Sequence, residues 1–208
     1  MLRKQYSSLV IDLLCREIDG DTVAVAYVYC EFSARNMQSA GTVLGSVLRQ
    51  VVGSLPEIPD EVRAAFELAQ KQVDGCGLRL SEILDMLVNS LSILKRAFIC
   101  IDAVDEFPLK HQSELWECLQ RLVQDCPNIR LFLTGRPHIG DQVGKYFPRT
   151  AEMLPIRPSP HDIELYLNMR LERDPEFDAM DKGLRADILR VISENVSGMC
   201  VLSQGVEF

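Results

Sequence analysis

Apolar residues follow two patterns along the chain, continuous runs and stripes at helical spacing. Continuous runs over 22–32 (TVAVAYVYCEF), 97–102 (AFICID) and 128–134 (NIRLFLT) predict strands that are buried on both faces. Helical spacing is clearest over 43–52 and 83–94, where valine, leucine and isoleucine return every three or four residues. Apolar strands separated by helices indicate a parallel sheet with helices on both faces, an α/β fold.

Shorter segments complete the predicted order of elements. Further helices are expected over 6–18, 61–72, 111–125 and 139–147. TAEMLPI (150–156) predicts one more strand, and beyond it the pattern is helical only, starting at Ser159 and Pro160. We therefore expect an α/β domain over 1–156 and the start of a helical extension over 157–208.

Composition narrows the classes of partner. The chain has 208 residues, a net charge of −8 and a pI near 5.0, which argues against a nucleic-acid partner because such proteins usually carry a basic face. No apolar run approaches the roughly 18 residues that a membrane span needs. The apolar start is broken by Asp12, unlike a signal peptide. We expect no membrane partner and a cytoplasmic location.

Cysteine and histidine usage gives little sign of a metal site. The seven cysteines include no C-x-x-C pair, and the three histidines are isolated, so zinc-ligand spacing is missing. This pattern favours reduced thiols in a reducing compartment, most of them core residues.

Three carboxylates follow the second apolar run. In FICIDAVDEF (98–107), Asp102 closes the run, and Asp105 and Glu106 follow after two small or apolar residues. Ligands of open parallel sheets bind beyond the carboxyl ends of the strands. A carboxylate there can hold Mg²⁺, and a second can orient or deprotonate a water; Glu106 is the better placed candidate, with Asp105 beside it. The alternative is a solvated acidic loop in which Asp105 or Glu106 merely favours a helix start.

The third apolar run ends in a threonine, a glycine and an arginine. In LFLTGRP (131–137), Thr134 and Arg136 should lie at the same edge of the sheet as Asp102. Arginine suits phosphate because its guanidinium offers fixed paired donors and stays charged. The alternative is a structural ion pair between Arg136 and Asp105 or Glu106.

Together the two segments resemble the NACHT domains of the STAND P-loop NTPases, in particular fungal-type NACHT/ankyrin proteins and nephrocystin-like NACHT regions, over about 5–199. The resemblance implies a P-loop NTPase-like fold and a signal-transduction switch that binds Mg²⁺ with ATP or GTP. It implies that Asp102 is the magnesium-associated acid of Walker B and that Glu106, supported by Asp105, is the catalytic or water-positioning acid. By the same resemblance, Arg136 and Thr134 belong to the segment that senses the terminal phosphate, where the family more often has T-S-R-P.

One element of that family does not occur in these residues. The phosphate loop, G-x-x-x-x-G-K-[ST], cradles phosphates with backbone donors, and the nearest stretch, GDQVGKY (140–146), has the wrong spacing. SSLVIDLL (7–14) resembles the helix that directly follows the loop. The resemblance thus implies a partial, truncated NACHT nucleotide-binding domain over 1–156 that lacks the first, phosphate-loop strand. Nucleotide binding by the chain alone is then expected to be weak or absent.

Other functions remain open from the sequence. The chain could be a non-enzymatic module that associates with intact NACHT proteins or other repeat-containing proteins. It could also be an unrelated enzyme that uses the three carboxylates as an acid/base set. A cysteine nucleophile is less favoured, since Cys100 lies within a core strand with no histidine nearby in the sequence.

Overall fold

The computed structural model describes residues 2–17, 22–34, 37–71, 77–148, 151–154, 159–173 and 181–196. The chain divides into two compact units, one over Arg3–Ala151 and one that starts at Glu152. The first unit contains three strands, β1 (Val23–Tyr29), β2 (Arg96–Asp102) and β3 (Ile129–Leu133). Its α-helices are α1 (Leu2–Glu17), α2 (Ala40–Gly53), α3 (Asp60–Lys71), α4 (Leu80–Ser92), α5 (Leu109–Asp125) and α6 (Gly140–Tyr146). Short 3-10 helices are η1 (Phe32–Ala34), η2 (Val104–Glu106) and η3 (Pro137–Ile139).

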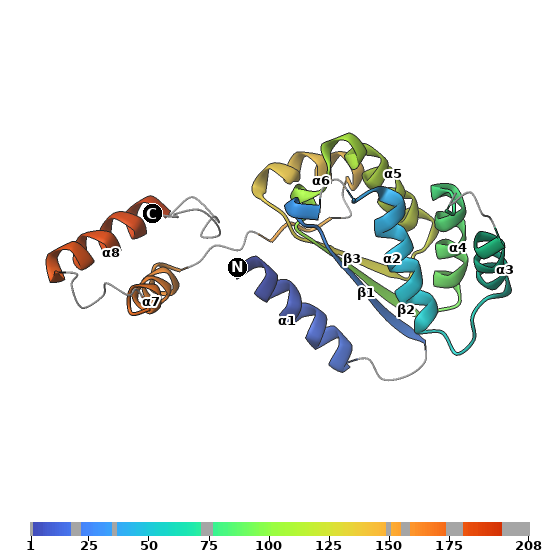
Figure 1. Ribbon diagram of the computed structural model, residues 1–208, viewed down its shortest axis with the longest axis horizontal. Coiled ribbons are helices and arrows are strands. Elements are labelled where there is room, and N and C mark those ends of the chain that lie inside the picture. Colours follow the sequence, from blue (N-terminus) through green and yellow to red (C-terminus); the bar gives the residue numbers. More distant parts are fainter. Residues whose placement is uncertain are drawn as a thin grey trace. The chain divides into compact units, whose positions relative to one another are not determined.

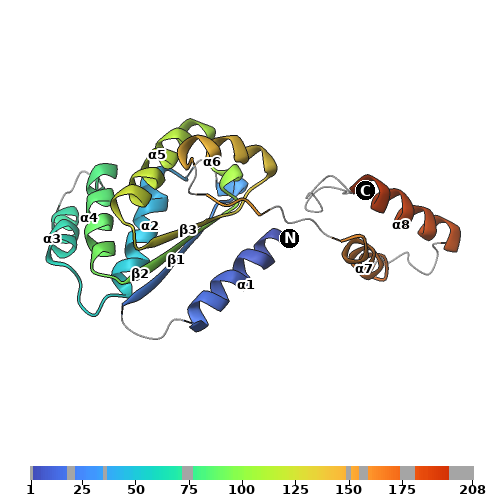
Figure 2. The same ribbon diagram turned by 180° about the vertical axis from the view of Figure 1, so that it is seen from behind.

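The strands form one parallel sheet in the order β1-β2-β3. The register places Tyr29 opposite Asp102 and Ile101 opposite Leu133, so all three strands end at the same edge. Helix α1 lies on one face of the sheet, and α2, α4 and α5 lie on the other (Figures 1 and 2). The predicted class, an α/β fold with a parallel sheet between helices, is confirmed.

The face under α2 and α4 holds the main hydrophobic core. Both stripes expected from helical spacing are buried, through side chains that include Val43, Leu44, Val47, Val51, Leu84, Leu87 and Leu91. Burying a side chain of this size stabilises a fold by about 1.5–3 kcal/mol relative to leaving it in water. These two helices therefore account for much of the stability of the first unit.

The opposite face is more open than the sequence predicts. We expected the first strand to be buried on both faces, and this is wrong: Ala24 and Ala26 are buried, whereas Tyr27 on the other side is 41% exposed. The reason is that, among the described helices of this unit, α1 is the one that lies on this face. Its Leu9 and Leu13 are themselves exposed.

The prediction of a strand over 150–156 is also wrong for the residues of that range that the structure describes. Residues 151–154 are exposed and form no strand, and the rest of that range lies outside the described residues. An apolar run becomes a strand only when a neighbouring backbone pairs with it. Within the described ranges β3 pairs with β2 and with no other strand.

A side chain closes the free edge of β1. The Gln50 carboxamide on α2 accepts a hydrogen bond from the backbone N–H of Tyr27 (3.1 Å) and donates one to the carbonyl of the same residue (2.9 Å). Gln50 thus satisfies both edge groups of Tyr27, as a neighbouring strand would. Unpaired strand edges are templates for association with other chains, so Gln50 protects this edge.

Replacing Gln50 with alanine is expected to promote self-association through β1. Because the freed backbone groups can bind water, the free energy of unfolding should change by less than about 1 kcal/mol. Sedimentation velocity over a concentration series measures the effect. Arg49→Ala, an exposed neighbour on the same helix, serves as the control. A Gln50→Ala chain that sediments like the wild type at every concentration would contradict the protective role.

The described part of the second unit contains two helices, α7 (Pro160–Leu171) and α8 (Lys182–Val196). As predicted, Ser159 caps α7. Its hydroxyl accepts from the Asp162 N–H (3.1 Å), and the Asp162 carboxylate accepts from the Ser159 N–H (2.9 Å). The Ser159 hydroxyl also donates to the Asp162 carboxylate (2.6 Å), and this bond, together with the one from the Ser159 N–H, lowers the pKa of Asp162. Arg185 of α8 donates to the Asn168 side chain of α7 (3.0 Å).

Across the described residues, every helix is too short or too polar to cross a bilayer.

Candidate functional site

Asp102 ends β2 and is almost completely buried, with 2% of its surface exposed. Its Oδ1 accepts two hydroxyl hydrogen bonds, from Ser7 Oγ (2.5 Å) and from Thr134 Oγ1 (2.5 Å). Its Oδ2 is equally buried and has no hydrogen-bond partner among the residues that the structure describes. Buried carboxylate oxygens normally have a partner, so Oδ2 is a candidate ligand atom.

Thr134 connects the ends of β2 and β3. Its hydroxyl accepts from the backbone N–H of Ala103 (2.9 Å) while donating to Asp102, and its carbonyl accepts from Val104 N–H (2.9 Å). These bonds hold Ala103 in the left-handed region (φ 55°), where a residue other than glycine needs support. Thr134 therefore orients Asp102 and fixes the turn after it. Its predicted contact with phosphate stays a prediction.

The turn sends the other two acidic side chains in different directions. Asp105 accepts from the Arg136 side chain (Nε, 3.3 Å) and from the Arg136 backbone N–H (3.2 Å). Glu106 accepts from the backbone N–H of Phe32 (3.2 Å), which begins η1. In the described ranges, no three His, Cys, Asp or Glu side chains group as metal ligands would. The catalytic role of Glu106 and Asp105 remains a prediction.

Arg136 lies at the same edge as Asp102, as the parallel strands require, and it forms the ion pair that the sequence left as an alternative. The Asp105 side chain in this pair is 1% exposed, and that of Arg136 is 49% exposed. A half-exposed guanidinium can still reach a ligand. Its role as a phosphate sensor stays a prediction.

Gly135 lies in a tight part of this loop. A Cβ at this position would overlap Cδ1 of Ile139 and lie 3.3 Å from Asp105 Oδ1. Ile139 is buried, so it has little room to move aside. The glycine therefore allows the loop to pass between the ion pair and the core.

Sequence reasoning missed Cys30, which lies beside the acidic residues. Its backbone N–H donates to the carbonyl of Asp102 (2.9 Å). Burial, and then the negative charges of Asp102, Glu106 and Asp105, raise the pKa of the Cys30 thiol to about 12. Burial also raises the pKa of Cys100 to about 11. Both thiols are neutral near pH 7, so the site offers no thiolate nucleophile.

Ser7 is the second residue that was missed. It belongs to α1 and is separated by 95 positions from Asp102, so no local spacing connects the two. The only signal was a pair of serines at the start of an otherwise apolar helical stretch, SSLVIDLL.

The donor set fits one magnesium ligand. Mg²⁺ prefers oxygen ligands and is usually held by one or two carboxylates, with waters and substrate phosphates completing its shell. Asp102 Oδ2 can supply one such oxygen. A bound Mg²⁺ would neutralise charge on nucleotide phosphates.

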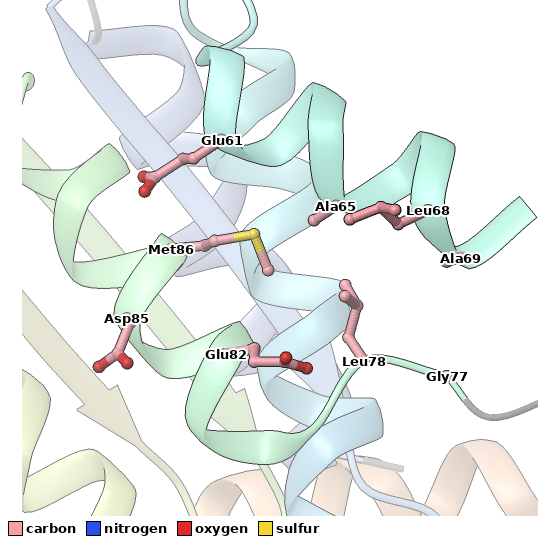
Figure 3. A pocket seen from close by; sticks show the side chains of 9 residues that line it. All are labelled: Glu61, Ala65, Leu68, Ala69, Gly77, Leu78, Glu82, Asp85 and Met86. Carbon is pink, nitrogen blue, oxygen red and sulfur yellow. The ribbon is translucent and has the colours of Figure 1, made fainter. Parts of the chain in front are cut away.

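A groove between α3 and α4 is a separate feature (Figure 3). Its lining includes neither Asp102 nor Asp105 nor Glu106. The lining residues are Glu61, Ala65, Leu68, Ala69, Gly77, Leu78, Glu82, Asp85 and Met86. Its carboxylates have partners elsewhere: Asn89 donates to Glu61 (3.0 Å), and Arg121 pairs with Asp85 (2.8 Å). The groove is therefore not a continuation of the Asp102 site.

Comparison with solved structures gives a loose likeness. The Aeropyrum pernix ORC1 protein, solved in complex with DNA, is 20% identical with a TM-score of 0.42, and the match covers 83% of this chain and 45% of that chain. This likeness carries no argument about function. The sequence predicts that the chain has no nucleic-acid partner, and this comparison does not bear out that prediction. Comparison with curated proteins found no match.

A family model gives a closer result. The model described as Nephrocystin 3, N-terminal matches residues 5–136, which is more than half of the 208 residues. The matched range contains Ser7, Asp102 and Thr134, and ends at Arg136. The nephrocystin-like resemblance seen in the sequence is thereby confirmed, and the chain belongs to the nephrocystin 3 N-terminal family.

Proposed function

We propose that the chain is part of a NACHT-type nucleotide switch, in which Asp102 is the magnesium-associated acid. The observation that carries this proposal is the buried, unpartnered Oδ2 of Asp102 at the carboxyl end of a parallel strand. Ligands of open parallel sheets bind at this edge. The substrate class is a magnesium-bound nucleoside triphosphate, ATP or GTP, and the working compartment is the cytoplasm.

The proposal assigns a part to each neighbouring residue. Glu106 would orient or deprotonate the attacking water, and Asp105 would hold Arg136 where its guanidinium can meet the terminal phosphate. The part given to Glu106 requires its carboxylate to exchange its present partner, the Phe32 N–H, for a water, whereas Arg136 keeps its pairing with Asp105 and offers the exposed part of its guanidinium. Both side chains are partly exposed, so both can meet a ligand.

The 208 residues by themselves are expected to bind nucleotide weakly. Phosphate-loop donors supply much of the affinity of such sites, and these residues contain no G-x-x-x-x-G-K-[ST]. We therefore expect a dissociation constant no tighter than about 1 mM, or roughly −4 kcal/mol. Hydrolysis should be negligible, because positioning and charge stabilisation carry phosphoryl transfer.

Two titrations of the purified chain test the proposal, one with Mn²⁺ as a paramagnetic substitute for Mg²⁺ and one with a fluorescent ATP or GTP analogue plus Mg²⁺. Asp102→Asn is the matched variant, because it keeps the shape of the side chain and removes its charge. We expect Mn²⁺ binding that Asp102→Asn abolishes, and no saturation by nucleotide below about 1 mM. A folded wild-type chain that binds no Mn²⁺ would exclude the metal role. A dissociation constant for nucleotide in the micromolar range would contradict the predicted weak binding.

A second function is favoured by the open face of the sheet. Tyr27 on β1 and Leu9 and Leu13 on α1 are exposed, and exposed apolar side chains are often contact sites for other proteins. The chain would then be a non-enzymatic module that associates with intact NACHT or repeat-containing proteins. A complex with such a protein that is unchanged in Asp102→Asn, together with no Mn²⁺ binding, would favour this function.

A further inference from the structure

Ser7 is a buried hydroxyl that reaches the acidic site from a helix on the opposite face to α2. It is 1% exposed, and its Oγ donates to Asp102 Oδ1 at 2.5 Å. Thr134, which follows β3, donates to the same oxygen at 2.5 Å. Both hydrogen bonds therefore fall on Oδ1, and Oδ2 is left free of partners in the described part of the chain.

The two hydrogen bonds to Oδ1 fix the direction in which Oδ2 of the same carboxylate points. If the carboxylate rotated, Oδ1 would lose the Ser7 bond, the Thr134 bond or both. Hydrogen bonds to a charged group are shorter and stronger than those between neutral groups, so this rotation is opposed. Ser7 and Thr134 thus hold Oδ2 in one position. Thr134 belongs to the sheet, whereas Ser7 belongs to a separate helix.

Helix α1 buries few of its described side chains. Among its side chains whose burial is described, Ser7 and Ile11 are the buried ones, while Leu9 and Leu13 are exposed. Ser8 Oγ lies 3.4 Å from the Tyr29 hydroxyl, a long contact at the partly exposed margin of the site. The Ser7–Asp102 bond is therefore a principal link between α1 and the carboxyl ends of the strands.

We infer that Ser7 is a positioning residue for Asp102, and that the docking of α1 is energetically coupled to the state of this carboxylate. The part of the inference that concerns a metal rests on the proposed function. The coupling itself rests on the buried hydrogen bond and needs no ligand. Coupling of this kind is reciprocal: whatever changes the Asp102 carboxylate changes the docking of α1, and displacement of α1 changes the affinity of Oδ2 for a cation.

The metal-dependent test measures Mn²⁺ binding by electron paramagnetic resonance on the full 208-residue chain. Loss of a residue that orients a metal ligand typically weakens metal binding by about 10- to 100-fold, and we expect this for Ser7→Ala. Ser7→Thr keeps the hydroxyl and should restore most of the affinity. Ser8→Ala, which removes the neighbouring hydroxyl from the same helix, should leave the affinity within about twofold, the scatter usual for single contacts.

The metal-independent test measures amide hydrogen exchange in α1 with no metal present. Ser7→Ala should exchange at least about tenfold faster over α1, whereas Ser8→Ala should match the wild type. If Ser7→Ala changes neither α1 exchange nor Mn²⁺ affinity, the inference is overturned. If the wild type binds no Mn²⁺ but Ser7→Ala loosens α1, the proposed metal role fails and the coupling is supported. If Mn²⁺ binds equally well to wild type and Ser7→Ala, Ser7 does not position Asp102.

Discussion

Replacing Trp116 with alanine is expected to lower the free energy of unfolding by about 3–5 kcal/mol, a large part of the stability of a domain this size. Trp116 is 1% exposed and is the only tryptophan in the chain. Its ring stacks on Tyr146 (centroids 6.0 Å apart) and meets Phe147 edge-on (6.1 Å). Its Nε1 donates to Gln142 (2.6 Å), so this side chain links α5 to α6 in addition to the bond from Gln120 to the Tyr146 carbonyl (2.8 Å). The variant loses the contacts of the Trp116 side chain and leaves a cavity.

Urea unfolding followed by circular dichroism measures this loss, since the variant has no tryptophan fluorescence. Trp116→Phe is the matched control. It keeps an aromatic ring against Tyr146 but cannot donate to Gln142, so its effect should be smaller. A Trp116→Ala chain within about 1 kcal/mol of the wild type would show that α6 is held by other contacts.

Replacing Arg136 with alanine is expected to destabilise the chain by about 2–3 kcal/mol, more than replacing Asp105 does. The asymmetry follows from burial. The Asp105 carboxylate is 1% exposed, so removing Arg136 leaves a buried charge with weaker compensation. The Arg136 guanidinium is 49% exposed, so it can turn to water when Asp105 is removed.

A double-mutant cycle on the free energy of unfolding tests this order. Arg136→Ala, Asp105→Ala and the double variant are compared without nucleotide. We expect the double variant to be more stable than Arg136→Ala alone, because it no longer buries a carboxylate that has lost the guanidinium. If Arg136 acted only as a phosphate sensor, its removal would leave stability unchanged in the absence of nucleotide. That outcome would contradict the structural ion pair.

Much of the sheet and of the site's location could be predicted from local sequence. The runs that form β2 and β3 are mostly apolar and do not alternate with polar residues, and parallel strands end at one edge, so Asp102, Thr134 and Arg136 had to lie near one another. The apolar stripes of α2 and α4 could also be predicted from local sequence, because residues three or four positions apart lie on the same face of a helix.

The partners of the acidic residues could not be predicted in this way. Asp105 and Glu106 are adjacent in sequence, but a left-handed Ala103 followed by a 3-10 turn points them at different neighbours. Backbone conformation at one alanine decides this, and no periodicity reports it. The contact of Ser7 with Asp102 and the exposure of Tyr27 depend on how α1 lies across the sheet, which is a tertiary property.

The close approach at Gly135 restricts how this loop can evolve. Any side chain at position 135 would meet the δ-methyl group of Ile139, which is itself enclosed by the core. A change from Ile139 to valine removes that methyl group and is mild by itself, whereas a change from Gly135 to serine is not mild while the isoleucine remains. A side chain at position 135 should therefore be tolerated better in an Ile139→Val variant than beside Ile139, although Asp105 Oδ1 stays close in either case.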